Sequence, residues 1–222
     1  MEWSESVFDG RRREMVEGLR RSGIMNARVL EAFLEVRRHL FFPESEREHA
    51  YDDAAWPIGH GQTISQPYTV AYMTSLLADR VPSGKVLEVG TGSGYQSAIL
   101  DAMGYRVFTI ERVAALYSEA LGRFRRFALP VAAKLGDGSE GWPEEAPFNA
   151  VLVTAAAPKE PEALLRQLSD NGCLVIPLGG MDVQQMTVIT RRGEVFLKER
   201  YHEFAFVPLI GREGWEEEQE QS

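Results

Sequence analysis

The sequence predicts an α/β fold in which helices cover both faces of a mostly parallel seven-stranded sheet, with a helical region in front. Two observations lead to this prediction. From Lys85 onward, five short apolar runs alternate with longer amphipathic stretches, as parallel strands joined by helical crossovers do. After Pro177, two further runs flank a turn at Arg192 and Gly193, which is typical of an antiparallel hairpin closing the sheet.

The elements follow in order along the chain. Residues 9–42 carry apolar side chains at three- and four-residue spacing, and Ser22 with Gly23 divides them into two helices. A third helix is expected over 68–78. The expected strands are 86–89, 107–110, 131–133, 150–153 and 173–176, and the expected helices between them are 95–103, 113–127 and 160–169. The hairpin strands are predicted at 185–190 and 194–197.

Composition limits the classes of partner. The 222 residues hold 33 acids and 24 bases, so the formal charge is -9 and phosphate backbones or anionic lipid would repel the chain. We therefore expect no nucleic-acid or membrane partner. The single cysteine, Cys173, excludes an intrachain disulfide and a cysteine-rich zinc site, and the four histidines show no ligand spacing. No metal is expected.

The N-terminus has no basic stretch followed by an apolar run, so a cytoplasmic location is expected. We expect a monomer built as one domain. Residues 1–80 supply helices and an active-site loop, residues 81–212 form the cofactor-binding core, and residues 213–222 form an acidic tail.

The first predicted strand runs into a glycine-rich turn, where Gly90, Gly92 and Gly94 precede a helix. Such a turn lets a ligand approach bare backbone at the carboxyl edge of a sheet. The dinucleotide pattern places its third glycine at position six, where this chain has Tyr95, so a pyrophosphate cradle is disfavoured. The pattern fits a cofactor that has an adenosine but no phosphates, such as S-adenosylmethionine. A tight turn without a ligand is the alternative.

Two further acidic positions support this hypothesis. Glu111 ends the second strand 21 residues after Gly90, near the spacing at which a carboxylate accepts hydrogen bonds from a ribose diol. Asp137 and Gly138 follow the third strand, where they could flank an adenine. Taken singly, Glu111 could be a solvated strand end and Asp137 with Gly138 a plain turn. Their strand-by-strand order favours the cofactor.

A charge-free segment, residues 59–67, leads into the third helix. Pro67 suits the first helical position, which places Thr63 and Ser65 beside free N–H groups and the positive end of a helix dipole. Such a site favours a carboxylate ligand. The alternative makes Ser65 a helix cap that stabilises the fold by about 1 kcal/mol.

Residues 37–208 resemble the protein-L-isoaspartate O-methyltransferases. The resemblance rests on motifs in the family's order, namely 38–43 with Ala50 and Tyr51, 61–67, 87–96, Asp137 with Gly138, 153–158 and 207–209. The Thr63-Ile64-Ser65 segment and the Thr154-to-Pro158 segment are more specific than the glycine turn. The resemblance implies a Rossmann-like class I S-adenosylmethionine-dependent methyltransferase fold.

The resemblance also implies roles for single residues. Ser65 matches the active-site serine of the family. The implied cofactor-binding residues are Glu88, Gly90, Thr91, Gly92, Ser93, Gly94, Glu111, Asp137, Gly138 and Gln185. The implied substrate-binding residues are Thr63, Ile64, Ser65, Thr154, Ala155, Val207 and Pro208. The chain departs from the family at Asn149, commonly an aspartate, and at Ile210, a threonine in some members.

The function implied is repair of damaged proteins, by methyl transfer from S-adenosylmethionine to the free α-carboxylate of L-isoaspartyl residues. Isoaspartyl peptides and proteins are then the partners. Two alternatives stay open at this point. The same cofactor could serve another acceptor, such as an RNA base or a small molecule, or the chain could be a binding module without catalytic activity.

Overall fold

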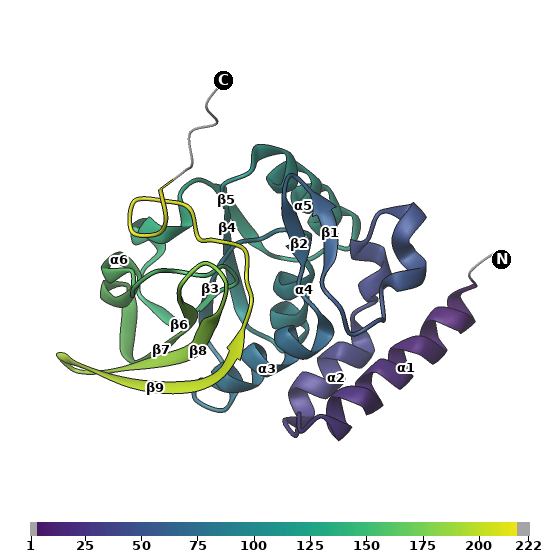
Figure 1. Ribbon diagram of the computed structural model, residues 1–222, viewed down its shortest axis with the longest axis horizontal. Coiled ribbons are helices and arrows are strands. Elements are labelled where there is room, and N and C mark those ends of the chain that lie inside the picture. Colours follow the sequence, from purple (N-terminus) through teal and green to yellow (C-terminus); the bar gives the residue numbers. More distant parts are fainter. Residues whose placement is uncertain (1–3, 217–222) are drawn as a thin grey trace.

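The computed structural model describes residues 4–216, and a seven-stranded sheet forms its centre (Figure 1). The strands are β3 (Lys85–Val89), β4 (Arg106–Glu111), β5 (Ala132–Leu135), β6 (Phe148–Val153), β7 (Leu168–Gly179), β8 (Gln184–Arg192) and β9 (Val195–Phe204). They are ordered β5-β4-β3-β6-β7-β8-β9. The first five in this order run parallel, whereas β8 is antiparallel to both neighbours. The expected α/β fold with a mostly parallel sheet is confirmed.

Both faces of the central strands are buried. Successive side chains of a strand point to opposite sides, so each central strand contributes to two clusters. In β6, Ala150 and Leu152 join a buried cluster that includes side chains of the first four helices. Val151 and Val153 join a second cluster, which lies on the other face and includes Leu164. The near-continuous apolar runs of the sequence therefore reflect two cores rather than one.

The α-helices are α1 (Glu5–Arg21), α2 (Ala27–Glu35), α3 (Pro67–Ala78), α4 (Tyr95–Ala102), α5 (Ala114–Arg126) and α6 (Glu162–Arg166). Figure 1 shows α1 and α2 at the opposite side of the molecule from α6. The break expected between the first two helices is confirmed, since α1 ends at Arg21 and Gly23 has a φ of +95°. The side chain of Asn26 caps α2 by accepting a hydrogen bond from the Val29 amide at 3.2 Å. No helix within residues 4–216 is long and apolar enough to cross a membrane.

The chain between α2 and α3 folds into short elements that the sequence did not reveal. They are the 3-10 helices η1 (Arg38–Phe41) and η2 (Glu44–His49) and a hairpin of β1 (Trp56–Gly59) and β2 (Gln62–Ile64). His60 and Gly61 form the hairpin turn with φ values of 54° and 67°, which suits a tight turn between right-twisted strands. This hairpin delivers Ser65 to the start of α3.

Several element boundaries differ from the predictions. The helical region expected to reach residue 42 ends at Glu35, and the strand expected at 173–176 spans Leu168–Gly179. The helix expected over 160–169 is only Glu162–Arg166, because Leu168 already pairs with Phe148 as part of β7. The third strand is shifted to Ala132–Leu135. The hairpin strands are much longer than predicted, and β9 reaches Phe204 although nearly all its side chains are exposed. Two further 3-10 turns, η3 (Gly138–Glu140) and η4 (Pro143–Glu145), precede β6.

After β9 the C-terminal segment, residues 205–215, returns across the carboxyl edge of the parallel strands (Figure 1). The Ala156 amide donates to the Val207 carbonyl at 2.8 Å, and the Leu209 amide donates to the Ala156 carbonyl at 2.7 Å. Glu213 accepts a hydrogen bond from the Ala163 amide, and the Trp215 indole donates to the Ala156 carbonyl. Residues 213–215, which we assigned to the tail, therefore pack on the core, and 217–222 lie outside the described residues.

Candidate active site

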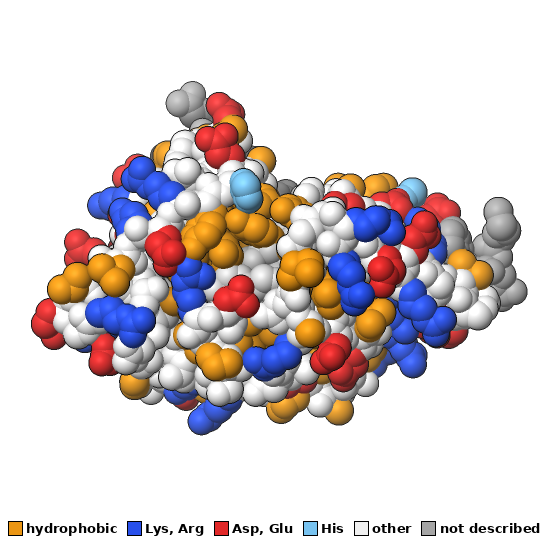
Figure 2. All heavy atoms as spheres, turned by 90° about the horizontal axis from the view of Figure 1, so that it is seen from below, with side chains coloured by type: hydrophobic (Ala, Val, Ile, Leu, Met, Phe, Trp, Pro, Cys, Tyr) orange, Lys and Arg blue, Asp and Glu red, His pale blue; other side chains and the backbone are white. Residues whose placement is uncertain are grey.

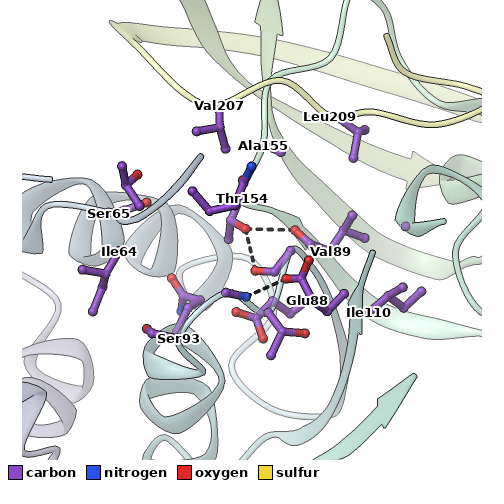
Figure 3. A pocket seen from close by; sticks show the side chains of 18 of the residues that line it. Ile64, Ser65, Glu88, Val89, Ser93, Ile110, Thr154, Ala155, Val207 and Leu209 are labelled. Carbon is purple, nitrogen blue, oxygen red and sulfur yellow. Dashed lines mark hydrogen bonds between the residues drawn. The ribbon is translucent and has the colours of Figure 1, made fainter. Parts of the chain in front are cut away.

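A cavity opens at the carboxyl ends of β3, β4 and β6, with about 870 Å³ of space including the part open to solvent. Segments from distant parts of the sequence line it: 62–65, 88–93, 110–112, 154–155 and 207–210, with Val70, Met73, Tyr95, Gln96 and Gly138. Figure 3 shows Ile64 and Ser65 on one side and Val207 and Leu209 on another, with Thr154 between them. The predicted cofactor and substrate segments thus meet at one place.

In the glycine turn, residues 90–94, two glycines have close neighbours that leave no room for a side chain. Gly90 has a φ of +97°, and a Cβ there would lie 2.4 Å from Thr154 Oγ1. That hydroxyl donates to the Gly90 carbonyl at 2.8 Å (Figure 3). Gly94 has a φ of +85° and sits against the Phe124 ring. Gly90 lines the cavity, whereas Gly94 lies behind it and lets α4 begin directly after the turn.

Glu111 joins the glycine turn to the end of β4. Its Oε2 accepts from the Gly92 amide at 2.8 Å, and its Oε1 accepts from the Val113 amide at 2.9 Å. Each carboxylate oxygen has a second lone pair, so a ribose diol could donate to both without breaking these bonds. The side chain lines the cavity where the sequence predicted a ribose-binding acid.

Glu88 is fully buried beneath the cavity. Its Oε2 accepts hydrogen bonds from the hydroxyls of Ser97 and Thr109, and Oε1 has no partner within the described chain. Burial, helped by the nearby charge of Glu111, raises the pKa of Glu88 to about 8 despite those two bonds. Glu88 is thus protonated at neutral pH, which keeps one negative charge away from the site.

Asp137 and Gly138 were predicted to contact the cofactor together, but only Gly138 lies at the cavity. Gly138 lines the cavity, and a Cβ there would meet Val89 Cγ1 at 2.4 Å, so only glycine leaves this wall flat. The Asp137 carboxylate does not line the cavity. Its Oδ1 accepts from the Ser139 amide and hydroxyl, and its Oδ2 accepts from the Arg212 amide at 2.8 Å. Asp137 fastens the C-terminal segment to the sheet edge.

Ser65 stands free beside the start of α3. The helix cap considered for it belongs to Asp53, whose Oδ1 accepts from the Tyr68 amide at 2.8 Å. The Ser65 hydroxyl makes no hydrogen bond within the described chain, whereas the Ser65 carbonyl accepts from Arg38 Nη2 at 2.8 Å. The cap alternative is therefore excluded, and the hydroxyl is available to a ligand.

Most, but not all, of the other predicted site residues line the cavity. Thr63, Ile64, Thr154, Ala155, Val207 and Pro208 line the cavity together with Thr91, Gly92 and Ser93. Gln185 does not line it. This half-buried side chain of β8 lies in a separate hollow beside Thr187 and Lys198 and donates to the Tyr201 carbonyl. Asn149 accepts from the Lys85 amide at 2.8 Å, so this departure concerns the start of β3 and not the site. Ile210 lines the cavity.

Sequence reasoning missed several lining residues. Tyr95 and Gln96 begin α4 directly after the glycine turn, and Met73 lies two helical turns after the Ser65 segment. Their position next to motif residues was the available signal. No group of three or more metal-binding side chains occurs among residues 4–216.

The cavity fits S-adenosylmethionine. Glycine backbone at one end, an acid that can accept from a ribose and flat apolar walls at Gly138 and Ile110 suit an amino-acid end, a sugar and a base in that order. An open α/β sheet with this arrangement at its carboxyl edge defines the class of S-adenosylmethionine-dependent methyltransferases.

Comparison with known proteins narrows the class. Residues 10–214 match the family model described as protein-L-isoaspartate(D-aspartate) O-methyltransferase, and the chain belongs to this family. A protein-L-isoaspartate O-methyltransferase of Chlorobium phaeovibrioides is 63% identical over 223 residues, which cover 98% of this chain and 97% of that protein. One of Chlorobaculum tepidum is 64% identical over 209 residues, covering 94% of this chain and 98% of that one.

A solved structure agrees. The Plasmodium falciparum crystal structure assigned to this family has a TM-score of 0.78 and 27% sequence identity, and it covers 89% of this chain and 97% of that one. It was solved in complex with S-adenosyl-L-homocysteine. The resemblance found from the motifs is confirmed.

Proposed function

We propose that this chain transfers a methyl group from S-adenosylmethionine to the free α-carboxylate of L-isoaspartyl residues in damaged proteins and peptides, and that Ser65 orients that carboxylate. The observation that carries the proposal is the unbonded Ser65 hydroxyl, which faces the cavity across from the glycine turn. Family membership supports the same reaction.

The acceptor needs little activation. A free α-carboxyl group has a pKa of about 3.5, so it is already ionised at neutral pH and requires no general base. When bound, S-adenosylmethionine supplies a methyl group made electrophilic by its sulfonium. The chain has to bring the carboxylate oxygen to about 3 to 3.5 Å from the methyl carbon, in line with the bond that breaks, and exclude water.

Each wall of the cavity has a part in this task. Glu111 and the glycine turn hold the cofactor end, and the neutral Glu88 avoids repelling an anionic substrate. The Ser65 hydroxyl donates to the substrate carboxylate, beside the start of α3, where the positive end of the helix dipole favours an anion. The C-terminal segment forms the opposite wall and excludes water.

We further propose that the chain acts as a cytoplasmic monomer on protein and not on nucleic acid. The single cysteine is buried as a free thiol, which suits a reducing compartment. The net charge is -9, and basic and acidic side chains are interspersed on the face shown in Figure 2. These features favour a protein substrate over a phosphate backbone.

The test pairs labelled cofactor with matched peptides that differ only in one isoaspartyl or aspartyl residue. A base-labile methyl ester formed only on the isoaspartyl peptide is expected. Transfer to RNA or to a small molecule instead, or binding without transfer, would contradict the proposal.

The role of Ser65 has its own test. Ser65→Ala should lower turnover on the order of 10²-fold, since misplacing a reacting group costs that much, while cofactor affinity stays nearly unchanged. Ser75→Ala is the control, because Ser75 lies in α3, the helix that begins two residues after Ser65, and its hydroxyl donates to the Ala71 carbonyl outside the cavity. Equal turnover of the two variants would show that Ser65 has no role in transfer.

A further inference from the structure

Arg38 is a buried cation directly behind the Ser65 turn, which we define as residues 63–67. Its exposed fraction is 0%, and no other arginine or lysine in the described chain is buried to this degree. Its Nε donates to the Ala50 carbonyl at 2.7 Å, and its Nη2 donates to the Ser65 carbonyl at 2.8 Å. One side chain from η1 therefore holds the backbone of the turn that carries the candidate active-site hydroxyl.

The same guanidinium contacts the cofactor side of the cavity. Its Cζ lies 4.6 Å from the centre of the Tyr95 ring and 5.3 Å from that of Phe42. Tyr95 is the first residue of α4, follows the glycine turn directly and lines the cavity. Arg38 thus links the Ser65 turn on one wall with the start of α4 on another.

Burying the charge of Arg38 costs free energy, and stabilisation of the fold alone does not explain it. No carboxylate within the described chain forms an ion pair with Arg38, and Nη1 has no hydrogen-bond partner there. Burial lowers the pKa of the guanidinium, yet arginine remains a cation in proteins. An apolar side chain of similar volume often stabilises a fold at least as well as buried charge does. The planar donor fork offers something that apolar packing lacks, which is a fixed distance between two backbone segments.

We propose that Arg38 is a positioning residue, which fixes the Ser65 turn relative to α4 and so sets the distance between the substrate carboxylate and the transferred methyl group. Arg38 does not line the cavity, so it acts through Ser65 and not by touching substrate. The inference rests on the proposed function, since it assumes that Ser65 orients the acceptor.

Arg38→Lys tests the proposal, because an ammonium keeps the charge but cannot hold two carbonyls in a fixed fork. We expect kcat to fall about tenfold or more, with the affinity for S-adenosylhomocysteine changed less than about threefold, since an orientation defect acts on the transition state. Arg28→Lys is the control. Arg28 also donates to two carbonyls, those of Pro82 and Met103, and lies over a tyrosine ring, but it is exposed and remote from the cavity. The kcat of Arg28→Lys should stay at the wild-type value.

A double-mutant cycle separates positioning from general packing. If Arg38 acts through Ser65, Arg38→Lys should lower kcat by less than about twofold in a Ser65→Ala background, because residues in one network do not contribute independently. The full tenfold loss in both backgrounds would overturn the proposal. So would unchanged kcat in Arg38→Lys alone.

Two measurements keep the outcomes distinct. Unfolding midpoints and product affinity are recorded first, and Arg38→Gln replaces the lysine variant in the cycle if that variant does not fold. If neither variant binds S-adenosylhomocysteine, Arg38 serves the whole fold, and a role confined to the turn is refuted. Wild-type protein that fails to methylate the isoaspartyl peptide would refute the proposed function itself, whereas an active wild type with an unaffected Arg38→Lys refutes only this inference.

Discussion

Glu88 should make the stability of the protein fall as pH rises. Burial raises the pKa of this carboxyl to about 8 in the folded chain, against an ordinary value of 4.5. Between these two values the folded state holds a proton that the unfolded state has released. Raising the pH therefore favours unfolding, and this contribution to stability is complete below pH 4.5, declines through the interval and is lost above pH 8.

The magnitude follows from the two pKa values. Each unit of pH within the interval costs up to about 1.4 kcal/mol, and the slope flattens near the folded pKa, so the free energy of unfolding should drop by about 2 kcal/mol between pH 6 and pH 8. Glu88→Gln removes this titration while its amide oxygen still accepts from Ser97 and Thr109. The amide nitrogen would replace the unpartnered Oε1, at a pH-independent cost of about 1–3 kcal/mol.

The assay is urea unfolding of both chains at pH 6, 7 and 8, with Glu31→Gln as the control because Glu31 is exposed on α2. Between pH 6 and pH 8, we expect the free energy of unfolding of wild type to fall by about 2 kcal/mol relative to that of Glu88→Gln. The control should track wild type. Parallel pH profiles for wild type and Glu88→Gln would refute the reasoning, because they would mean that Glu88 is ionised in the folded chain at neutral pH.

Three other substitutions test the packing. Gly94→Ala puts a Cβ 2.7 Å from Phe124 at a φ of +85°, so it should destabilise the chain by about 1–3 kcal/mol and weaken product binding, as denaturant melts and calorimetry would record. Gly122→Ala, in the middle of α5 with no atom within 4 Å, should instead stabilise by up to about 1 kcal/mol, and effects of equal sign would contradict the account. Leu152→Ala, fully buried in β6, should cost about 2–5 kcal/mol in unfolding free energy, and a cost below 1 kcal/mol would show that the first core is not tightly packed.

The parallel sheet and the cofactor end of the site could be predicted because their signals are local. Runs such as 150–153 are apolar throughout, since both faces of β6 are buried, and the glycine turn follows its strand directly. Glu111 was predicted from its place at the end of the second strand and its spacing from Gly90, and the family resemblance implied the same role. The carboxyl ends of neighbouring parallel strands lie together at one edge of the sheet. A short motif that directly follows such a strand can therefore be placed in the structure from the sequence.

Other features depend on contacts that sequence periodicity does not encode. β9 has nearly all side chains exposed, so no alternation marked its length. The cap of α3 comes from Asp53, 15 residues before the Tyr68 amide that it accepts from, and the Asp137 carboxylate is occupied by Arg212, 75 residues away. Arg38 belonged to a recognised motif, yet only the fold shows that it reaches Ser65.

The cavity wall formed by residues 207–210 is one of the last parts of the protein to be synthesised. Translation proceeds from the N-terminus, so a nascent chain that has reached Phe204 already contains all seven strands and the glycine turn. It still lacks the segment that pairs with Ala156 and forms one wall of the cavity. Chains released early, or shortened by proteolysis at this end, would keep the glycine turn and Glu111 but leave the cavity open on one side.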